Sequence, residues 1–407
     1  MIFVISTVVF SSVILFLVSL LLLVEAKIVK KGDCEIVIND DMSKSIHTAT
    51  RSTLLSALME NGIFLPSACG GGGSCGTCKC RVDQGGGGVL PTELAHLNRK
   101  EKNNHIRLAC QLKVKEDLHI HIPEEIFNVK KYQATVILND NVATFIKELV
   151  LKIDHKEALE FNAGAYIQID IPKYELSFTE FKARVAERFR PVWDRFNLWG
   201  LRMKTEEPVF RAYSLANPPS EKNILRFTVR IAIPPPGVAI APPGAGSSYI
   251  FNLKKGDQVT LSGPYGDFFV KDTDKEMCFI GGGAGMAPLR SQIFHQLNTI
   301  NTSRIISFWY GARSIMELFF NDEFRALEDR FKNFSYNVAL SQPKPEDNWD
   351  GMTGHIHQCL YDNYLKTHDD PTEIEYYLCG PPMMLDAAIE MLDSQGVEPE
   401  MIAFDKF

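Results

Sequence analysis

The chain begins with a long apolar run. Residues 1–24 contain no charged side chain, and the first charge is Glu25. As a helix with a rise of 1.5 Å per residue, this run reaches roughly 36 Å, more than the ~30 Å hydrocarbon core of a bilayer. The lysines that follow favour a cytoplasmic position for the rest of the chain. We expect residues 1–26 to be a transmembrane anchor. A cleaved signal peptide is the competing interpretation, but it requires basic residues before a shorter apolar core.

Residues 33–128 show the pattern of a small β-rich domain with one helix. Glu35–Asn39 and Leu118–Ile122 alternate apolar and polar side chains, as half-buried strands do, and Lys79–Val82 predicts another short strand. Thr50–Asn61 carries an apolar stripe at helical spacing and is followed by Gly62, a typical stop signal. Together these segments predict an α+β domain.

Residues 130–270 predict an antiparallel β-barrel. Short strand-like segments are separated by turn residues, which is typical of barrels. They are Thr135–Leu138, Ala165–Ile171, Phe210–Leu215, Leu225–Ile231 and Gln258–Ser262. The charged stretch Ser177–Asn197 interrupts them with a helical pattern, and we interpret it as a helix packed on the barrel.

Residues 273–407 alternate strands and helices, which predicts a doubly wound α/β domain with a parallel sheet. The expected strands are Met277–Ile280, Arg304–Tyr310, Ser335–Leu340 and Glu375–Leu378, and the expected helices are Met286–Leu297, Asn321–Arg330 and Met383–Ser394. The whole chain is therefore expected to be multidomain: an anchor, an α+β domain, a barrel and an α/β domain.

Composition narrows the function classes. Of the 407 residues, 45% are hydrophobic and 23% charged, which excludes a disordered or collagen-like chain. A net charge of -7 argues against non-specific binding of nucleic acid. Nine cysteines are too few for a disulfide scaffold of this length, yet several of them crowd between Cys69 and Cys80. Such crowding indicates metal or redox chemistry.

The cysteine spacing predicts an iron–sulfur cluster. Cys69, Cys75 and Cys78 lie on one Gly-rich loop, and Cys110 offers a fourth thiolate, the number that a 2Fe-2S cluster needs. The loop glycines permit positive φ angles and leave room for sulfide. Zinc is the alternative, although zinc ribbons usually have two Cys-x-x-Cys pairs. We interpret Cys80 as a packing thiol.

Two further stretches have the residue types of a flavin site. The predicted strand Arg211-Ala212-Tyr213-Ser214 supplies a cation for a diphosphate, an aromatic ring for the flavin and a polar side chain near its reactive nitrogen. The stretch that contains Gly246, Ser247 and Ser248 can surround a phosphate with backbone N–H groups and hydroxyls. In this order along the chain, they predict flavin binding.

A nucleotide site is expected in the last domain. A strand runs into the turn Gly282-Gly283-Ala284-Gly285 and then a helix, which lets a diphosphate approach the helix N-terminus. Cys379-Gly380 ends the last predicted strand, at the sheet edge where ligands bind. Phe404, close to the C-terminus, is expected either to cover a flavin face until nicotinamide displaces it or to pack in the core.

These motifs together resemble the ferredoxin-NADP reductase superfamily, and the added iron–sulfur domain resembles oxygenase reductase components. With the N-terminal apolar run, the whole chain is similar to the family of subunits through which NADH electrons enter the bacterial sodium-translocating NADH:quinone oxidoreductase. This resemblance implies FAD and NADH rather than FMN and NADPH. It also implies a 2Fe-2S cluster on Cys69, Cys75, Cys78 and Cys110, partner subunits that reach a quinone, and a single-pass location in the inner membrane.

The resemblance also implies site roles. The residues implied to contact FAD are Arg211, Ala212, Tyr213, Ser214 and Gly246, with either Ser247 or Ser248 at the phosphates. Those implied to contact NADH are Gly282, Gly283, Ala284, Gly285, Cys379 and Gly380. Cys379, Ser214 and Phe404 are expected at the reacting rings. Two alternatives remain: a reductase component that feeds an oxygenase, and a tethered iron–sulfur carrier whose C-terminal domains have lost their cofactors.

Overall fold

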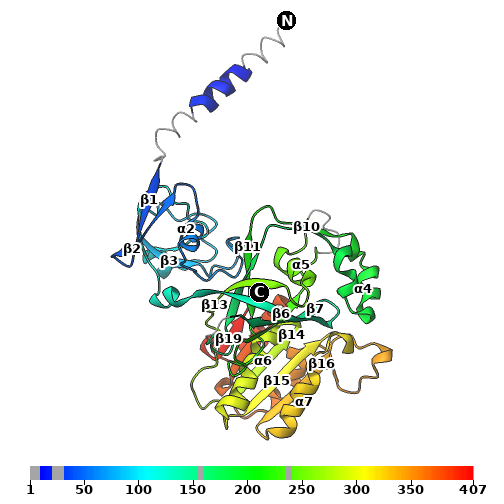
Figure 1. The fold of residues 1–407 in the computed structure, drawn as a ribbon. Helices are drawn as coiled ribbons and strands as arrows, with labels where there is room; N and C mark the ends of the chain where they lie inside the picture. The colour runs from blue at the N-terminus through cyan, green and yellow to red at the C-terminus, as the bar shows by residue number, and fades with distance from the viewer. Residues whose placement is uncertain (1–9, 21–31, 155–158, 235–240, 407) are drawn as a thin grey trace. The chain divides into compact units, whose positions relative to one another are not determined.

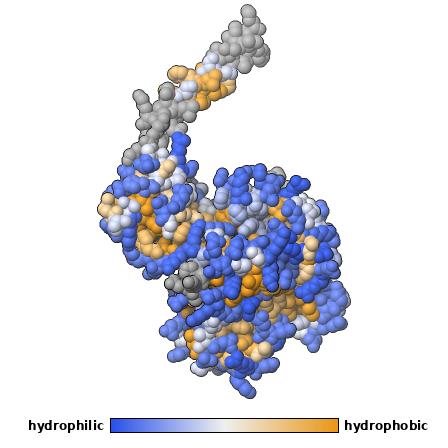
Figure 2. All heavy atoms as spheres, viewed as in Figure 1, coloured by the Kyte–Doolittle hydropathy of each residue, from blue (hydrophilic) through white to orange (hydrophobic). Residues whose placement is uncertain are grey.

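The computed structural model describes residues 10–20, 32–154, 159–234 and 241–406. The chain forms two compact units, residues 1–130 and 131–407, and each is described by itself (Figure 1). Most of the expected anchor 1–26 lies outside the described residues. Within that segment, residues 10–20 are helical and exposed, and Figure 2 colours them mostly as hydrophobic. Among the described residues, no helix combines the length and the apolar character that crossing a bilayer requires.

The first unit contains a five-stranded sheet in the order β2-β1-β5-β3-β4. Its strands are β1 (Asp33–Ile38), β2 (Asp41–Ala49), β3 (Lys79–Gln84), β4 (Ile106–Leu108) and β5 (Leu118–His121). The three predicted strands are confirmed, whereas the mostly polar β2 gave no alternating signal. Among the described residues after Gly32, the helices of this unit are α2 (Leu54–Glu60), which was predicted, and α3 (Arg99–Asn103), which was not.

Helix α2 begins later than the predicted Thr50. The Thr53 hydroxyl accepts a hydrogen bond from the N–H of Ser56 at 3.1 Å, so Thr53 is the N-cap and the helix starts at Leu54. Its buried face, Leu54, Leu55 and Leu58, is the stripe seen in the sequence.

The barrel in the second unit is confirmed as antiparallel, in the order β11-β8-β13-β6-β7-β12. Its strands are β6 (Lys130–Ala143), β7 (Ile146–Ile153), β8 (Tyr166–Ile171), β11 (Val209–Ser214), β12 (Ile224–Arg230) and β13 (Gln258–Tyr265). The N–H of Ala216 donates to the carbonyl of Arg226 at 2.7 Å, so the chain after β11 meets β12 and closes the sheet there. Helix α5 (Ala245–Asn252) packs on the barrel.

The predicted helix Ser177–Asn197 is wrong. The segment begins in a small strand pair, β9 (Glu175–Ser177) with β10 (Arg202–Lys204), and contains 3₁₀ turns followed by one short helix, α4 (Arg190–Arg195). The physical reason is its own aromatic core, which folds the chain back on itself: Trp193 is fully buried and stacks on Trp199 at 4.9 Å. The indole N–H of Trp193 donates to the carbonyl of Thr144 at 2.8 Å, so the segment packs on the barrel as expected.

The remaining lobe is the predicted parallel sheet, in the order β17-β16-β15-β14-β18-β19 (Figure 1). Its strands are β14 (Met277–Gly282), β15 (Ile306–Ala312), β16 (Phe334–Leu340), β17 (Met352–Thr353), β18 (Glu375–Cys379) and β19 (Ile402–Asp405). Helices α6 (Met286–His295) and α7 (Asn321–Arg330) cover one face, and α8 (Ile356–Asn363) and α9 (Pro382–Ser394) the other. The three predicted helices are confirmed, with α6 two residues shorter. Helix α8 and the edge strands β17 and β19 were not predicted.

Candidate functional site

The four predicted cluster cysteines lie together as two pairs of thiols. The sulfurs of Cys69 and Cys75 are 3.3 Å apart, and Cys78 and Cys110 share a hydrogen bond between their sulfurs. The second pair forms because β3 and β4 are hydrogen-bonded and the N–H of Ala109 donates to the carbonyl of Cys78 at 2.9 Å. The described residues contain no group of three or more histidine, cysteine or acidic side chains placed for a single metal ion.

The loop that carries three of these cysteines depends on its glycines. Gly70, Gly71, Gly73 and Gly76 have φ angles of 65°, 87°, 75° and 70°, which confirms the expected positive values. A Cβ atom on Gly73 would lie 2.5 Å from Nε2 of Gln111, and one on Gly76 would lie 2.9 Å from Nδ1 of His96. The side chains of Gln111 and His96 therefore pack directly against the backbone of the loop at Gly73 and Gly76.

The His96 ring adds a direct bond to this loop, because its Nε2 lies 3.0 Å from the carbonyl oxygen of Gly73. Neither His96 nor Gln111 was singled out from the sequence, since their contacts depend on chain segments that meet only in the fold.

Hydrogen bonds make one thiol of each pair the more acidic. The bond from Cys75, then the backbone N–H groups of the loop, lower the pKa of Cys69 to about 3, and the bond from Cys78 lowers that of Cys110 to about 6. The bond from Cys75 to Cys69 raises the pKa of Cys75 itself to about 12. Each pair is thus organised around one thiolate, the form that binds metals.

Cys80 lies outside this arrangement. It is buried opposite Arg107 in the β3–β4 register, and burial raises its pKa to about 12. Arg107 forms a buried ion pair with Glu93 at 2.7 Å, and Glu93 also accepts the N–H of Leu108, two residues before Cys110. This pair was not predicted from the sequence, because Glu93 and Arg107 lie 14 residues apart and meet only in the fold.

The flavin motif is brought together by one close contact between β11 and α5. A Cβ atom on Gly246 would lie 2.4 Å from the hydroxyl oxygen of Tyr213 and 2.9 Å from Cγ of Arg211. Arg211 and Tyr213 therefore share a face of β11, as alternation predicts, and only glycine fits opposite them. Ala212 lies between them and pairs with Gln168 of β8.

The two serines of the motif have different surroundings. The hydroxyl of Ser247 donates to the carbonyl of Gly244 at 3.2 Å and accepts the N–H of Ala232 at 3.0 Å, which fixes the turn before α5. Ser248 is fully buried, and its N–H donates to Gly244. The N–H groups before it in the first turn, those of Gly246 and Ser247, have no partner within the helix and can serve an anion.

The nucleotide motif is assembled at the carboxyl ends of β14 and β18. A Cβ atom on Gly285 would lie 2.1 Å from the carbonyl oxygen of Cys379, and one on Gly380 would lie 3.0 Å from that of Gly282. Gly283 has a φ of 57°. The carbonyl of Ala284 accepts the Thr228 hydroxyl of the barrel at 2.9 Å. The strand order reverses at β14, and ligands of open α/β sheets bind beside such a reversal.

Cys379 is buried with a neutral thiol. Burial, and then the carboxylate of Asp405, raise its pKa well above the ordinary value, so it is not an activated nucleophile. Asp405 lies opposite Cys379 in the β18–β19 register and accepts the Ser214 hydroxyl at 3.1 Å. Cys379 and Ser214 are thus linked through Asp405, a residue that the sequence pattern did not mark.

Phe404 is not brought together with these residues. It lies opposite Leu378 in the register, whereas Asp405 lies opposite Cys379, and neighbouring residues of a strand point to opposite faces. Its side chain is 50% exposed, which contradicts the alternative of core packing. The catalytic role of Phe404 stays a prediction.

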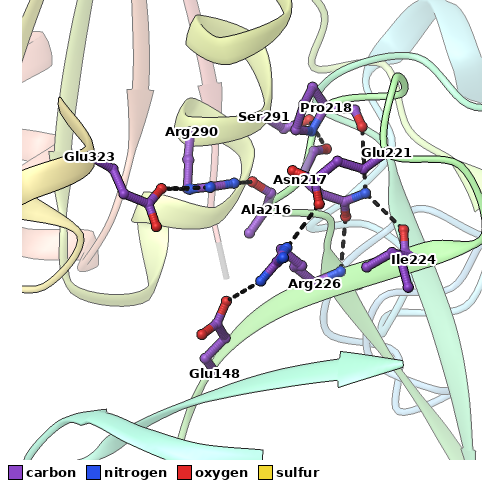
Figure 3. A network of polar contacts seen from close by, with 10 residues as sticks. All are labelled: Glu148, Ala216, Asn217, Pro218, Glu221, Ile224, Arg226, Arg290, Ser291 and Glu323. Atoms are coloured by element: carbon purple, nitrogen blue, oxygen red, sulfur yellow. Dashed lines mark hydrogen bonds and ion pairs between the residues drawn. The ribbon is translucent and has the colours of Figure 1, made fainter. Parts of the chain in front are cut away.

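Three consecutive residues of α6 fix this lobe to the barrel. Arg290, Ser291 and Gln292 each donate to a barrel carbonyl, at 2.7 Å to Ala216, 2.7 Å to Asn217 and 2.6 Å to Phe268. Figure 3 shows the first two, with Arg290 held from its other side by Glu323. Because α6 follows the Gly282–Gly285 turn directly, these bonds set the nucleotide turn relative to the flavin motif.

Comparisons with known proteins agree with this division. The sequence matches the 2Fe-2S iron-sulfur cluster binding domain family over residues 38–115, the oxidoreductase FAD-binding domain family over 199–270 and the oxidoreductase NAD-binding domain family over 279–390. Among solved structures, a cytochrome P450 reductase, GcoB, of Amycolatopsis has a TM-score of 0.63 at 25% identity, covering 92% of this chain and 98% of that one. A ferredoxin reductase in carbazole 1,9a-dioxygenase has a TM-score of 0.61 at 24% identity with the same coverage, a likeness of fold alone.

Curated relatives are far more similar. The F subunit of the Na(+)-translocating NADH-quinone reductase of Klebsiella pneumoniae is 52% identical over 99% of this chain and 99% of its own. Those of Actinobacillus succinogenes and Haemophilus ducreyi are also 52% identical, over 98% and 100% of this chain and 97% and 98% of theirs. With identity of this level over nearly its whole length, the chain belongs to the family of F subunits of the Na(+)-translocating NADH-quinone reductases.

Proposed function

We propose that this chain is the electron-entry subunit of a sodium-translocating NADH:quinone reductase, in which it oxidises NADH and delivers electrons to partner subunits and finally quinone. The observation that carries the proposal is that residues 131–407 contain both a flavin motif and a nucleotide turn. In the flavin motif, Gly246 packs closely against Tyr213, and in the nucleotide turn, Gly285 packs closely against Cys379. FAD, when bound, accepts a hydride from NADH and releases electrons singly, as a 2Fe-2S centre requires.

The flavin residues have roles that follow from their chemistry. The guanidinium of Arg211 would pair with the diphosphate, together with the first-turn N–H groups of Gly246 and Ser247, while Ser248 would offer its buried hydroxyl. The Tyr213 ring would lie against the flavin. Ser214 would place its hydroxyl, and the Asp405 carboxyl hydrogen-bonded to it, at the reacting edge of the flavin ring. Ala212 lies two residues before Ser214 on β11 and would contact FAD through its backbone.

NADH would bind across the carboxyl edge of the parallel sheet. Gly282, Gly283, Ala284 and Gly285 leave the backbone open to its diphosphate, while Cys379 and Gly380 would position the nicotinamide. A neutral, buried thiol excludes water there without reacting covalently. Phe404 would cover the flavin ring until nicotinamide displaces it.

The thiol pairs fit a cluster of two irons, because each iron then takes two protein thiolates. In this assignment one iron binds Cys69 and Cys75 and the other binds Cys78 and Cys110. The loop N–H groups that donate to these sulfurs, such as that of Cys69 to Cys75 at 3.4 Å, would tune the reduction potential.

A single-pass anchor over residues 1–26 would keep the domains at 33–128, 130–270 and 273–407 on the cytoplasmic side of the inner membrane, beside the partner subunits. The absence of any charge in residues 1–24 supports this assignment. Fractionation tests it: the full chain should sediment with membranes after a high-salt wash, and a chain lacking residues 1–26 should not. Release of both chains by salt would reject the anchor.

The order of carriers is tested by replacing one cysteine at a time. Cys75→Ala should remove the iron–sulfur absorption and leave anaerobic bleaching of FAD by NADH intact. Cys80→Ala is the matched control and should keep both signals, because Cys80 lies outside the two thiol pairs. If a folded, FAD-loaded Cys75→Ala protein lost NADH-driven flavin reduction, the proposed order would be wrong.

A reductase that serves an oxygenase is the alternative, and the solved structures of similar fold include such proteins. It is less supported than the main proposal, because the curated relatives are twice as similar in sequence and cover the whole chain. Restoration of quinone reduction in membranes that lack only this subunit would separate the two functions.

A further inference from the structure

We propose that Lys147, buried at the C-terminal end of helix α5, is a positioning residue that sets the affinity of the barrel for FAD. This rests on the proposed flavin function, since α5 carries Gly246, Ser247 and Ser248 at its other end. Nothing in the sequence pattern marks Lys147, which stands on the strand β7.

Lys147 is unusual because it is a fully buried lysine whose ammonium group bonds to carbonyl oxygens. Its exposed fraction is 0%. Its Nζ donates to the carbonyls of Asn139 at 3.2 Å and Phe251 at 3.4 Å, and it lies 5.4 Å from the centre of the Phe251 ring. Lysines are almost never fully buried unless paired, so this placement calls for a compensating interaction.

The end of α5 provides that compensation. The last four carbonyls of a helix have no partner within it and carry partial negative charge. Here the side-chain amide of Asn139 donates to the carbonyls of Ile250 at 2.7 Å and Leu253 at 2.9 Å. The Lys147 ammonium group donates to the carbonyl of Phe251, which lies between these two residues in the chain. The ammonium group therefore sits against the negative end of the helix dipole.

The two ends of α5 are coupled because the helix is short. Eight residues span about 12 Å, so a charge that orients one end also fixes the other. At the N-terminal end, α5 has little room to move, because even a Cβ atom on Gly246 would lie 2.4 Å from the Tyr213 hydroxyl oxygen and 2.9 Å from Cγ of Arg211. A tilt of α5 would move its first-turn N–H groups away from the diphosphate.

The charge on Lys147 depends on pH within a measurable range. Burial, and then the charge of Arg184, which bonds to Asn252 of α5, lower its pKa to about 8, while Asp140 of β6 acts in the opposite direction. Because the folded-state pKa lies below the ordinary 10.5, the group loses its proton as pH rises through about 8. The contact with the α5 carbonyls should weaken over the same range.

The test measures FAD affinity on the full chain in detergent, stripped of FAD, by quenching of flavin fluorescence at pH 7 and pH 9. Lys147→Met should weaken FAD binding about tenfold at pH 7, within the range of charge–dipole effects in buried sites. The wild type should lose affinity between pH 7 and 9, and Lys147→Met should not. Lys152→Met is the matched control, an exposed lysine on the same strand, and should bind FAD like the wild type.

Lys147→Arg separates positioning from folding, because arginine stays charged at both pH values. It should keep affinity at pH 7 and lose the pH dependence. The inference is overturned if Lys147→Met binds FAD as tightly as the wild type, if Lys152→Met is equally weakened, or if Lys147→Arg shows the wild-type fall with pH. A wild-type chain that binds no FAD would instead reject the proposed function.

Discussion

The hydroxyl of Ser214 donates to the Asp405 carboxylate at 3.1 Å, which joins the barrel strand β11 to the edge strand β19 across 191 residues of sequence. Burial raises the pKa of Asp405 and nearby Asp267 adds to this, while the bond from Ser214 lowers it. One hydrogen bond therefore helps to decide whether a carboxylate or a carboxylic acid stands beside Cys379.

We expect Asp405→Asn to stabilise the protein at pH 8 more than at pH 5. A carboxyl whose folded-state pKa is raised favours folding below its ordinary pKa of 3.8, and this contribution is lost as pH rises through the folded-state value. The amide has no charge to bury. Thermal unfolding of residues 131–407 within the full chain, followed at both pH values, checks this.

Ser214→Ala is the companion change, and Ser335→Ala, an exposed serine of β16, is its control. Loss of the Ser214 bond should cost about 1–3 kcal/mol at pH 8, because the carboxylate keeps its burial without its donor. Equal stability of wild type and Ser214→Ala at pH 8 would contradict the assigned hydrogen bond.

Gly246→Ala should abolish FAD binding while the barrel still folds. The added methyl would lie 2.4 Å from the Tyr213 hydroxyl oxygen, a clash that either moves α5 or displaces the ring. Gly200→Ala, where nothing lies within 4 Å of the added methyl, should bind FAD normally. FAD content after purification and the dissociation constant measure the effect. Normal FAD binding by Gly246→Ala would mean that α5 does not hold the cofactor.

The sequence predicted elements whose pattern is local, and missed those that depend on contacts between distant segments. Helix α7 was expected at its observed bounds because its apolar spacing and flanking loops are self-contained. The loop glycines around Cys69 and Cys75 were assigned correctly because thiolate spacing and positive φ leave few alternatives.

The misses have physical causes too. The stretch after Ser177 has a helical pattern, but Trp193 is fixed by the carbonyl of Thr144, a tertiary contact that overrides local preference. Asp405 and Glu93 were not predicted as site residues, since only the fold brings Ser214 and Arg107 to them. Lys147 gave no signal for the same reason.

Arg290, Ser291 and Gln292, which we call the α6 clamp, hold the nucleotide-binding lobe on the barrel. We therefore expect that weakening the clamp slows hydride transfer without loss of cofactors. Ser291→Ala removes the 2.7 Å bond to the carbonyl of Asn217, a buried residue; Figure 3 shows this bond. We expect NADH-driven flavin reduction at saturating NADH to fall about tenfold, because small misplacements of reacting groups are costly. FAD content and the NAD+ dissociation constant should stay near wild type.

Arg290→Lys gives a second measure of the clamp, because lysine can keep the bond to Ala216 but not the paired bonds to Glu323. Its rate should lie between those of wild type and Ser291→Ala. A parallel loss of NAD+ affinity in Ser291→Ala would indicate damage to the nucleotide turn itself and would reject a positioning role.

Glu93→Gln should destabilise residues 33–130 by about 3–5 kcal/mol, because it leaves Arg107 buried without its carboxylate. Burial opposes ionisation of Glu93, but bonds from Arg107, Leu90 and Leu108 outweigh it and hold its pKa below the ordinary 4.5. A lowered carboxyl pKa stabilises the fold above pH 4.5, and this stability is lost as pH falls through the folded-state value.

The measurement is loss of iron–sulfur absorption as pH is lowered, with unfolding by urea at pH 7 alongside. Glu101→Gln is the matched control: its pair with Lys79, at 2.7 Å, is partly exposed, so it should cost at most about 1 kcal/mol. The Arg107 bonds to the carbonyls of Gly86 and Gly87 anchor the loop before Glu93, so Glu93→Gln should also release that loop to proteolysis. Equal effects of the two glutamine variants would show that the buried pair does not support the cluster strand.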